Sequence, residues 1–277
     1  MVECAQLQLG TLRAVADHSW TFGESLVLEV EAADQSRFFL KEHRKRQNYN
    51  TELRMYQELV PQIQGAAPVL LGAEDSRNLL MLTAVPGTRA DVLGCPGSLG
   101  MYRRAGEVLR QFHSAASSVP VKDWAARQNK SLENWIRSDR LGALRAEEIG
   151  LSRLVIDALP RGETVDTVWT HRDWRPRNWI VGADSLYVID FEHARREPWL
   201  ADVAKLWFVE WDGRPHLRNS FFEGYGRHPS AKDEQTIRAI ATISHVSTIV
   251  WASHDGATEL VAEARAALGS VRRSTVD

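Results

Sequence analysis

Two short motifs constrain this chain more than any other feature. The first is HRDWRPRN at residues 171–178, and the second is VIDFE at residues 188–192. The apolar runs WIV and LYVI, which border the motifs, have the composition of short strands. The pattern predicts a tight loop supported by a small hairpin, with Asp173, Asn178 and Asp190 directed at one site.

These three polar residues have the chemistry of a phosphoryl-transfer site. Such a site needs a carboxylate that orients the attacking hydroxyl and accepts its proton, and it needs ligands for the Mg²⁺ that neutralises the phosphates. Asp173 suits the first role, and Asn178 and Asp190 offer the hard oxygen donors that Mg²⁺ prefers. A bare HRD tripeptide also occurs by chance, and an aspartate can simply end a hairpin. The combined pattern favours the functional interpretation.

The N-terminal part is rich in strand patterns. LVLEV at residues 26–30 alternates between apolar and polar positions, and RFFLKEH at 37–43 follows a polar turn, so the two runs predict an antiparallel hairpin. Residues 50–60 have helical spacing and end at a proline. Two further strands are predicted at 67–72 and 78–85.

Helical patterns dominate after about residue 98, apart from a β-rich stretch at 165–192. Helices are predicted near residues 99–115, 122–140, 146–159, 199–212, 216–226, 232–252 and 256–268. One stripe in the long C-terminal helix runs from Ile237 to Val246. We therefore expect an α+β chain with two lobes, a β-rich N-terminal lobe at 1–85 and a larger, mostly helical lobe at 86–277.

Composition narrows the class of protein further. The 277 residues are 44% hydrophobic and 25% charged, as in ordinary soluble proteins. The net charge of −2 gives no indication of a nucleic-acid or membrane partner. The start of the chain has no signal-peptide pattern, and no apolar run is long enough to span a bilayer. Cys4 and Cys95 are too few for a disulfide framework or a multi-cysteine metal site. We expect a cytoplasmic protein.

The two motifs resemble those of the aminoglycoside phosphotransferase and choline kinase-like family, which is related to the protein kinases. That family usually shows H-G-D-x-x-x-x-N and I-D-[FW]-[ED], and here Arg172 replaces the glycine. The resemblance implies a protein-kinase-like fold, with Asp173 as catalytic base and Asn178 and Asp190 as Mg²⁺ ligands. Arg175 would contact the transferred phosphate, or it is a structural or solvated arginine.

The same resemblance assigns nucleotide contacts in the N-terminal part. Lys41 would grip the α- and β-phosphates, and Glu52, early in the next helix, would pair with Lys41. On an alternating strand Lys41 shares a face with Phe39 and is opposite Phe38 and Leu40.

Three further contacts follow from the resemblance. The main chain of Thr83 and Val85 would bind the adenine edge, and the turn at 17–25, which ends at Ser25, would cover the phosphates. This turn contains no GxGxxG motif, so its contacts stay unassigned. Asp202 would brace the catalytic loop. The resemblance extends from about residue 10 to residue 210.

The acceptor is expected to be a small molecule. Only residues 191–201 separate Asp190 from Asp202, and they contain no APE motif and no room for a protein-kinase activation segment. A polycationic acceptor such as an aminoglycoside needs several carboxylates, for which Glu192 and Glu210 are candidates. The many arginines around the motifs make a neutral or acidic acceptor equally plausible.

Aromatic residues offer a second kind of acceptor contact. Trp207 and Trp211 are able to stack on a sugar or a base, although burial in the core is the commoner fate of tryptophan.

Together these observations predict an ATP- and Mg²⁺-dependent O-phosphotransferase, with GTP as an alternative donor. The expected acceptor is an antibiotic of the aminoglycoside, nucleoside or sugar-acid type, modified for resistance or self-protection. Two alternatives stay open: a metabolic kinase for choline, a sugar, homoserine or a fructosamine, and a pseudokinase that binds nucleotide without turnover. The expected assembly is a monomer or a homodimer.

Overall fold

The computed structural model describes residues 1–276 except 4, 6–9, 64 and 94–97. Cys4 and Cys95 therefore lie outside the described residues. The chain divides into two compact units. Unit 1 comprises residues 1–116 and 176–195, and unit 2 comprises residues 117–175 and 196–277. The sequence-based boundary between residues 85 and 86 stays a prediction.

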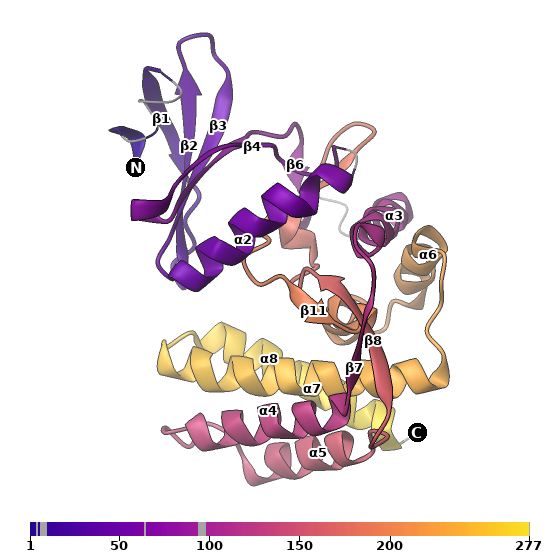
Figure 1. Cartoon of the computed structure of the whole chain (residues 1–277). Coiled ribbons are helices and arrows are strands. Elements are labelled where there is room, and N and C mark those ends of the chain that lie inside the picture. Colours follow the sequence, from indigo (N-terminus) through magenta and orange to yellow (C-terminus); the bar gives the residue numbers. More distant parts are fainter. Residues whose placement is uncertain (4, 6–9, 64, 94–97, 277) are drawn as a thin grey trace. The chain divides into compact units, whose positions relative to one another are not determined.

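An antiparallel five-stranded sheet forms the N-terminal part of unit 1 (Figure 1). Its strands are β1 (Leu12–Asp17), β2 (Ser25–Ala32), β3 (Arg37–His43), β4 (Leu70–Glu74) and β5 (Leu79–Thr83), in the order β1-β2-β3-β5-β4. Strands β2 and β3 form the predicted hairpin, in a register that pairs Leu28 with Leu40.

The two faces of this sheet carry different side chains. Leu40 belongs to an apolar cluster with Val30 and Met81, and residues of the N-terminal segment pack against it. Lys41, the next residue along β3, is directed to the opposite face. Helix α2 (Arg46–Glu58) packs on that face and buries Glu52 beside the lysine. Strand alternation thus places one ammonium between sheet and helix, as the sequence predicted.

The rest of unit 1 holds the second motif. A three-stranded sheet has the order β10-β9-β6 and consists of β6 (Thr88–Arg89), β9 (Trp179–Val181) and β10 (Leu186–Val188). Helix α3 (Leu99–Ser114) packs against β10. Short helical turns complete the unit: η1 (Val60–Gln62), η2 (Asp75–Arg77), η3 (Ala90–Val92) and η4 (Pro176–Asn178). The β9–β10 hairpin is the one that the sequence predicts between the two motifs.

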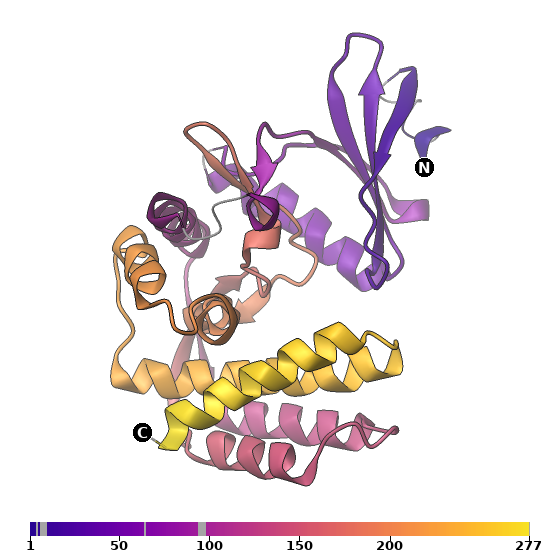
Figure 2. The same cartoon turned by 180° about the vertical axis from the view of Figure 1, so that it is seen from behind.

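Helices dominate unit 2. They are α4 (Trp124–Ser138), α5 (Ala146–Asp157), α6 (Pro215–Tyr225), α7 (Ala231–His254) and α8 (Thr258–Val276). Figure 2 shows α7 and α8 side by side, and α4 and α5 pack against α7. The predicted stripe from Ile237 to Val246 is buried in this layer. Among the described helices, none combines the length and apolar character that a membrane crossing requires.

A small three-stranded sheet and an irregular segment complete unit 2. The sheet has the order β11-β8-β7 and consists of β7 (Val119–Lys122), β8 (Thr164–Thr170) and β11 (Arg195–Glu197). The helix predicted at 199–212 is a 3₁₀ turn, η5 (Trp199–Asp202), followed by a π-helical turn, η6 (Leu206–Glu210). Departures of this kind from the α-helix are frequent at functional sites.

Gly87, just before β6, lies very close to the backbone of β9, and a substitution there tests this close contact. Its φ is +133°, and a Cβ there would lie 2.4 Å from the Val181 carbonyl oxygen. Replacing Gly87 by Ala should therefore lower the free energy of unfolding by about 3 kcal/mol, through steric overlap and backbone strain together. Urea unfolding followed by circular dichroism measures the change.

Gly142 provides the matched control. Its φ is +63°, but a Cβ added there would meet no atom within 4 Å. Gly142→Ala should cost only about 1 kcal/mol, the ordinary penalty of a left-handed residue. Equal losses for the two variants would contradict the close approach of β6 to β9.

Candidate active site

A buried ion-pair network surrounds Lys41 in unit 1. The Lys41 Nζ lies 2.5 Å from Asp190 Oδ1, 2.7 Å from Glu52 Oε2 and 3.4 Å from Glu192 Oε2. Burial by itself would lower the pKa of the lysine, but the carboxylates of Asp190, Glu52 and Glu192 outweigh burial and raise it. The ammonium is therefore fixed and permanently charged.

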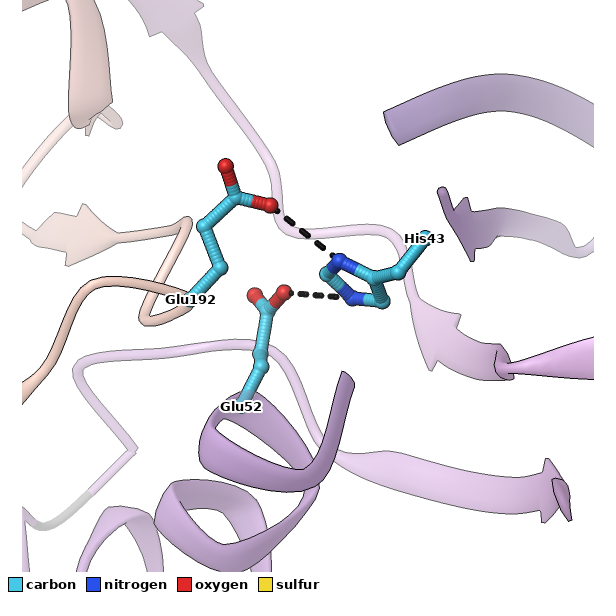
Figure 3. A group of neighbouring side chains, drawn as sticks. All are labelled: His43, Glu52 and Glu192. Carbon is cyan, nitrogen blue, oxygen red and sulfur yellow. Dashed lines mark ion pairs between the residues drawn. The ribbon is translucent and has the colours of Figure 1, made fainter. Parts of the chain in front are cut away.

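His43 lies between two of these carboxylates, as Figure 3 shows. Its Nε2 is 2.9 Å from Glu52 Oε2, and its Nδ1 is 3.1 Å from Glu192 Oε2. Burial alone would lower the pKa of the imidazole, but contacts with Glu192 and Glu52 raise it. Burial alone would raise the pKa of the Glu192 carboxyl, but Lys41 and His43 lower it to about 2. The two glutamates thus favour the imidazolium form of His43.

The trio of His43, Glu52 and Glu192 also has the composition of a metal site. Its geometry favours an ion-pair network instead. The two ring nitrogens of His43 face different carboxylates, one on each glutamate (Figure 3). In addition, the Lys41 ammonium already lies close to the same two oxygens.

The predicted metal ligands Asn178 and Asp190 are both in unit 1. Asn178 is buried at the end of η4, and its carbonyl accepts a hydrogen bond from the N–H of Ile189, at 3.1 Å. Asp190 is the residue after Ile189, and its φ is +73°. A left-handed aspartate is uncommon, and such residues cluster at functional sites. The main-chain hydrogen bond therefore brings the two predicted ligands to adjacent parts of the chain.

The turn between β1 and β2 lies where the sequence predicts the phosphate-covering loop. The Arg177 guanidinium, next to Asn178, lies over the Trp20 ring of this turn, 5.7 Å from its centroid. Ser25 is the first residue of β2 and pairs in register with His43. These contacts place the turn near η4 within unit 1, although no sequence signal identified Trp20.

Thr83 and Val85 end the last predicted strand. The Thr83 N–H donates to the Val69 carbonyl at 3.0 Å, and the Val69 N–H donates to Thr83 Oγ1 at 2.9 Å. An adenine contact at Thr83 would therefore use its carbonyl. Val85 follows the end of β5 in an irregular segment. Both nucleotide assignments stay predictions.

The first motif begins in unit 2, where one aspartate holds its backbone. The Asp202 carboxylate accepts hydrogen bonds from the N–H groups of His171, at 2.9 Å, and Arg172, at 2.5 Å. His171 is fully buried, and its Nδ1 accepts from the Asp173 N–H at 3.3 Å. Arg172 has φ +73°, a conformation that explains why glycine is usual at this position of the motif. Asp202 thus braces the loop, as the resemblance implied.

Two cationic side chains lie near Asp173 in unit 2. The Lys205 Nζ is 3.0 Å from Asp173 Oδ1. The Arg175 guanidinium instead binds Glu210 Oε1, at 2.6 Å from its Nε, and Glu263 Oε1, at 2.9 Å from its Nη1. Burial raises the pKa of the Glu210 carboxyl, and the guanidinium opposes that rise. The structure therefore gives Arg175 carboxylate partners, and its predicted phosphate contact stays a prediction.

The four residues predicted to contact the acceptor have different surroundings. Glu192 belongs to the His43 network of unit 1, and Glu210 is paired with Arg175 in unit 2. Trp211 is buried and contacts Phe221 and Phe222. The ring of Trp207 lies under the Arg218 guanidinium, 4.5 Å from the centroid. Each of these side chains has protein partners, and a role in acceptor binding stays a prediction for all four.

Sequence reasoning missed three charged residues at these sites. His43 is two positions after Lys41 on β3, and this i, i+2 spacing is a signal that was available. Lys205 follows Asp202 by three positions, which on a helical segment is one turn. Glu263 lies on α8 and reaches Arg175 from far along the chain, so no local pattern identifies it.

Comparison with known proteins identifies the family. The sequence profile of the phosphotransferase enzyme family, designated APH, matches residues 23–239. The chain belongs to this family, which confirms the predicted resemblance and the predicted class of enzyme, a small-molecule phosphotransferase. None of the curated proteins is similar enough in sequence to count as a match.

Several solved structures have the same fold, and the similarity covers almost the whole chain. A thermostable mutant of aminoglycoside phosphotransferase APH(4)-Ia, in ternary complex with AMP-PNP and hygromycin B, is 15% identical with a TM-score of 0.74, and the match covers 99% of this chain and 97% of that one. Macrolide 2′-phosphotransferase MphH from Brachybacterium faecium is 18% identical with a TM-score of 0.68, covering 96% and 97%. A choline/ethanolamine kinase family protein from Mesorhizobium loti is 16% identical with a TM-score of 0.66, covering 96% and 88%. These likenesses confirm the predicted α+β, protein-kinase-like fold.

The raised pKa of His43 predicts a pH-dependent contribution to stability. The contribution is fully present below the pKa of an unfolded histidine, about 6.5, and is lost as the pH rises through the higher pKa of the folded state. His43→Gln should therefore lower the free energy of unfolding by about 3 kcal/mol at pH 6, and by progressively less toward pH 9. Urea unfolding of both proteins at each pH measures the difference.

His216→Gln is the control, because that side chain is exposed and its loss should have little effect at any pH. A His43→Gln penalty that stayed constant from pH 6 to pH 9 would contradict the imidazolium bridge.

Proposed function

We propose that this enzyme transfers the γ-phosphoryl group of ATP to a hydroxyl of a small molecule, with Mg²⁺ as the metal. The observation that carries the proposal is the buried Lys41 ammonium, which contacts both Glu52 and Asp190. A fixed cation next to a metal-binding carboxylate is the arrangement that holds nucleotide phosphates together with their metal. The AMP-PNP bound to the APH(4)-Ia relative supports a nucleotide as donor.

Lys41 would contact the α- and β-phosphates. Its salt bridge to Glu52 fixes the side chain, and the Phe191 N–H donates to the other oxygen of Glu52 at 3.1 Å. Glu52 therefore connects the lysine to the residue directly after Asp190. Thr83 and Val85 would contact adenine through their main chain, and the turn that ends at Ser25 would cover the phosphates.

The donor set fits Mg²⁺. Asn178 and Asp190 offer an amide and a carboxylate oxygen, and Mg²⁺ prefers hard oxygen ligands completed by water and phosphate. The 2.5 Å contact between Lys41 and Asp190 also shows that positive charge is favourable at this carboxylate. When bound, the metal would neutralise charge on the phosphates as the γ-phosphoryl group is transferred.

Asp173 would orient the acceptor hydroxyl and accept its proton. Asp173 is largely buried. Its backbone N–H donates to His171 Nδ1, and the backbone N–H of the preceding residue donates to Asp202. A carboxylate held in this way loses little freedom when it meets the acceptor, which favours reaction. Asp173 and Asn178 lie on one short, continuous stretch of chain, so the base and a metal ligand belong to the same loop.

An antibiotic is the acceptor class that we propose, in a resistance or self-protection role. The relatives' names support it, since they include aminoglycoside and macrolide phosphotransferases. Among antibiotics, we propose a neutral or weakly charged acceptor. Glu210 is paired with Arg175 and Asp212 with Arg273, so these carboxylates offer little negative charge to a cationic acceptor.

Replacing Asp173 by Ala tests the assignment of the base. The variant should lose at least about 100-fold in turnover, because general-base assistance is removed, while its affinity for ATP stays close to that of the parent. Turnover is measured as phosphorylated product by mass spectrometry, over a panel of antibiotics and hydroxylated metabolites, and ATP affinity by calorimetry. Asp184→Ala, in the exposed turn between β9 and β10, is the matched control and should keep the parent rate.

Two outcomes would contradict the proposal. Turnover of Asp173→Ala at the parent rate would show that another group is the base. If the unaltered chain binds ATP but phosphorylates no compound of the panel, a nucleotide-binding pseudokinase becomes the better interpretation.

A further inference from the structure

The segment that contains η5 and η6 reaches the catalytic loop with two side chains. Asp202, at the end of η5, accepts hydrogen bonds from the backbone of His171 and Arg172. Lys205, one turn further, contacts the side chain of Asp173, with its Nζ 3.0 Å from Oδ1. Residues three apart on a helical segment share a face. One face of this segment therefore holds both the loop backbone and the side chain of the base.

Arg175 is the other cation near the base, and its surroundings differ. Its Nε lies 2.6 Å from Glu210 and its Nη1 lies 2.9 Å from Glu263, and only 14% of its side chain is exposed. A guanidinium held by two carboxylates has its charge compensated and its geometry fixed. Arg175 therefore has the character of a structural cation that joins η6 to α8.

Lys205 has the properties that a reacting phosphoryl group requires. A quarter of its side chain is exposed, so Lys205 is partly accessible to solvent where it contacts Asp173. An ammonium has three donors on a flexible stem and can contact a carboxylate and a phosphoryl oxygen together. Burial, with the charges of Lys205 and Arg175, lowers the pKa of the neighbouring His245 to about 3, so that histidine adds no charge at neutral pH.

We propose that Lys205 is a further catalytic residue, whose ammonium orients the Asp173 carboxylate and stabilises the transferred phosphoryl group. This inference rests on the proposed function. In the reaction the acceptor oxygen bonds to the γ-phosphorus, the bond from that phosphorus to the β,γ-bridging oxygen breaks, and its electron pair leaves with ADP. The hydroxyl proton passes to Asp173, and Lys205 stays protonated throughout.

The position of Lys205 also bears on the acceptor. When Asp173 takes up the hydroxyl proton its negative charge is lost, and the Lys205 ammonium 3.0 Å away then repels a cationic group on the acceptor close to the reacting hydroxyl. We therefore expect the reacting hydroxyl to belong to a neutral or anionic part of the acceptor.

Four variants test the inference on the full-length chain, with the best acceptor from the panel. Lys205→Met should lower kcat about 100-fold with little change in the KM for ATP, because a charge that acts in the transition state is lost. Lys205→Arg should keep an intermediate kcat, since it keeps the charge. Lys205→Ala should regain activity when methylammonium or ethylammonium is added. Lys232→Met, at an exposed lysine paired with Glu163, should match the parent.

A fifth variant separates catalysis from structure. Arg175→Met leaves Glu210 and Glu263 without their cation and should unfold at a clearly lower urea concentration than the parent, whereas Lys205→Met should unfold close to the parent.

Several results would overturn the inference. Lys205→Met at the parent kcat would do so and would leave the proposed function intact. A loss of activity that alkylammonium ions do not restore, together with unfolding as early as Arg175→Met, would show that the lysine is structural. A change confined to the KM for ATP would make Lys205 a nucleotide contact instead. Absence of any turnover by the unaltered chain, on the whole panel, would overturn the proposed function and this inference together.

Discussion

The salt bridge between Lys41 and Glu52 is the interaction on which the rest of unit 1 depends. A buried ammonium is very unfavourable unless carboxylates compensate it. Glu52 does so from α2, Asp190 and Glu192 do so from the second motif, and His43 holds the two glutamates from the other side. The ammonium of Lys41 thus joins three separate stretches of chain: strand β3, helix α2 and the second motif. The network fixes the lysine in place, so the proposed binding of a nucleotide would require little further ordering of this side chain.

Charged side chains also organise the loop of the first motif in unit 2. Asp202 holds the backbone of the loop at His171, Lys205 contacts Asp173, and Arg175 is bound by Glu210 and Glu263. One short segment, from the end of η5 to the residue before η6, thus contacts both the backbone of the loop and the side chain of Asp173. Arg175 and Lys205 thus differ in their surroundings, because two carboxylates bind the first and Asp173 contacts the second.

Much of the fold could be predicted from local patterns. The β2–β3 hairpin, the strand β5, helix α2 and the stripe in α7 all follow from apolar runs, alternation or helical spacing, because the residues that these elements bury are close together in the sequence. The segment predicted as helical at 199–212 is helical, but its type was not predictable, since its apolar pattern is satisfied equally by 3₁₀ and π turns and only its hydrogen bonds distinguish them. The family, and with it the class of enzyme, was evident from the two motifs.

The sequence by itself determined which residue types are present for phosphoryl transfer: a lysine on an alternating strand, an acid in the next helix, and the Asp, Asn and Asp of the two motifs. Only the tertiary structure decided how the remaining charges are distributed. Glu192 joins His43, Glu263 reaches Arg175 from α8, and the ammonium of Lys205 contacts the carboxylate of Asp173. The physical reason is that the strength of an ion pair depends on the distance between the charges and on their burial, and the local sequence determines neither of these quantities.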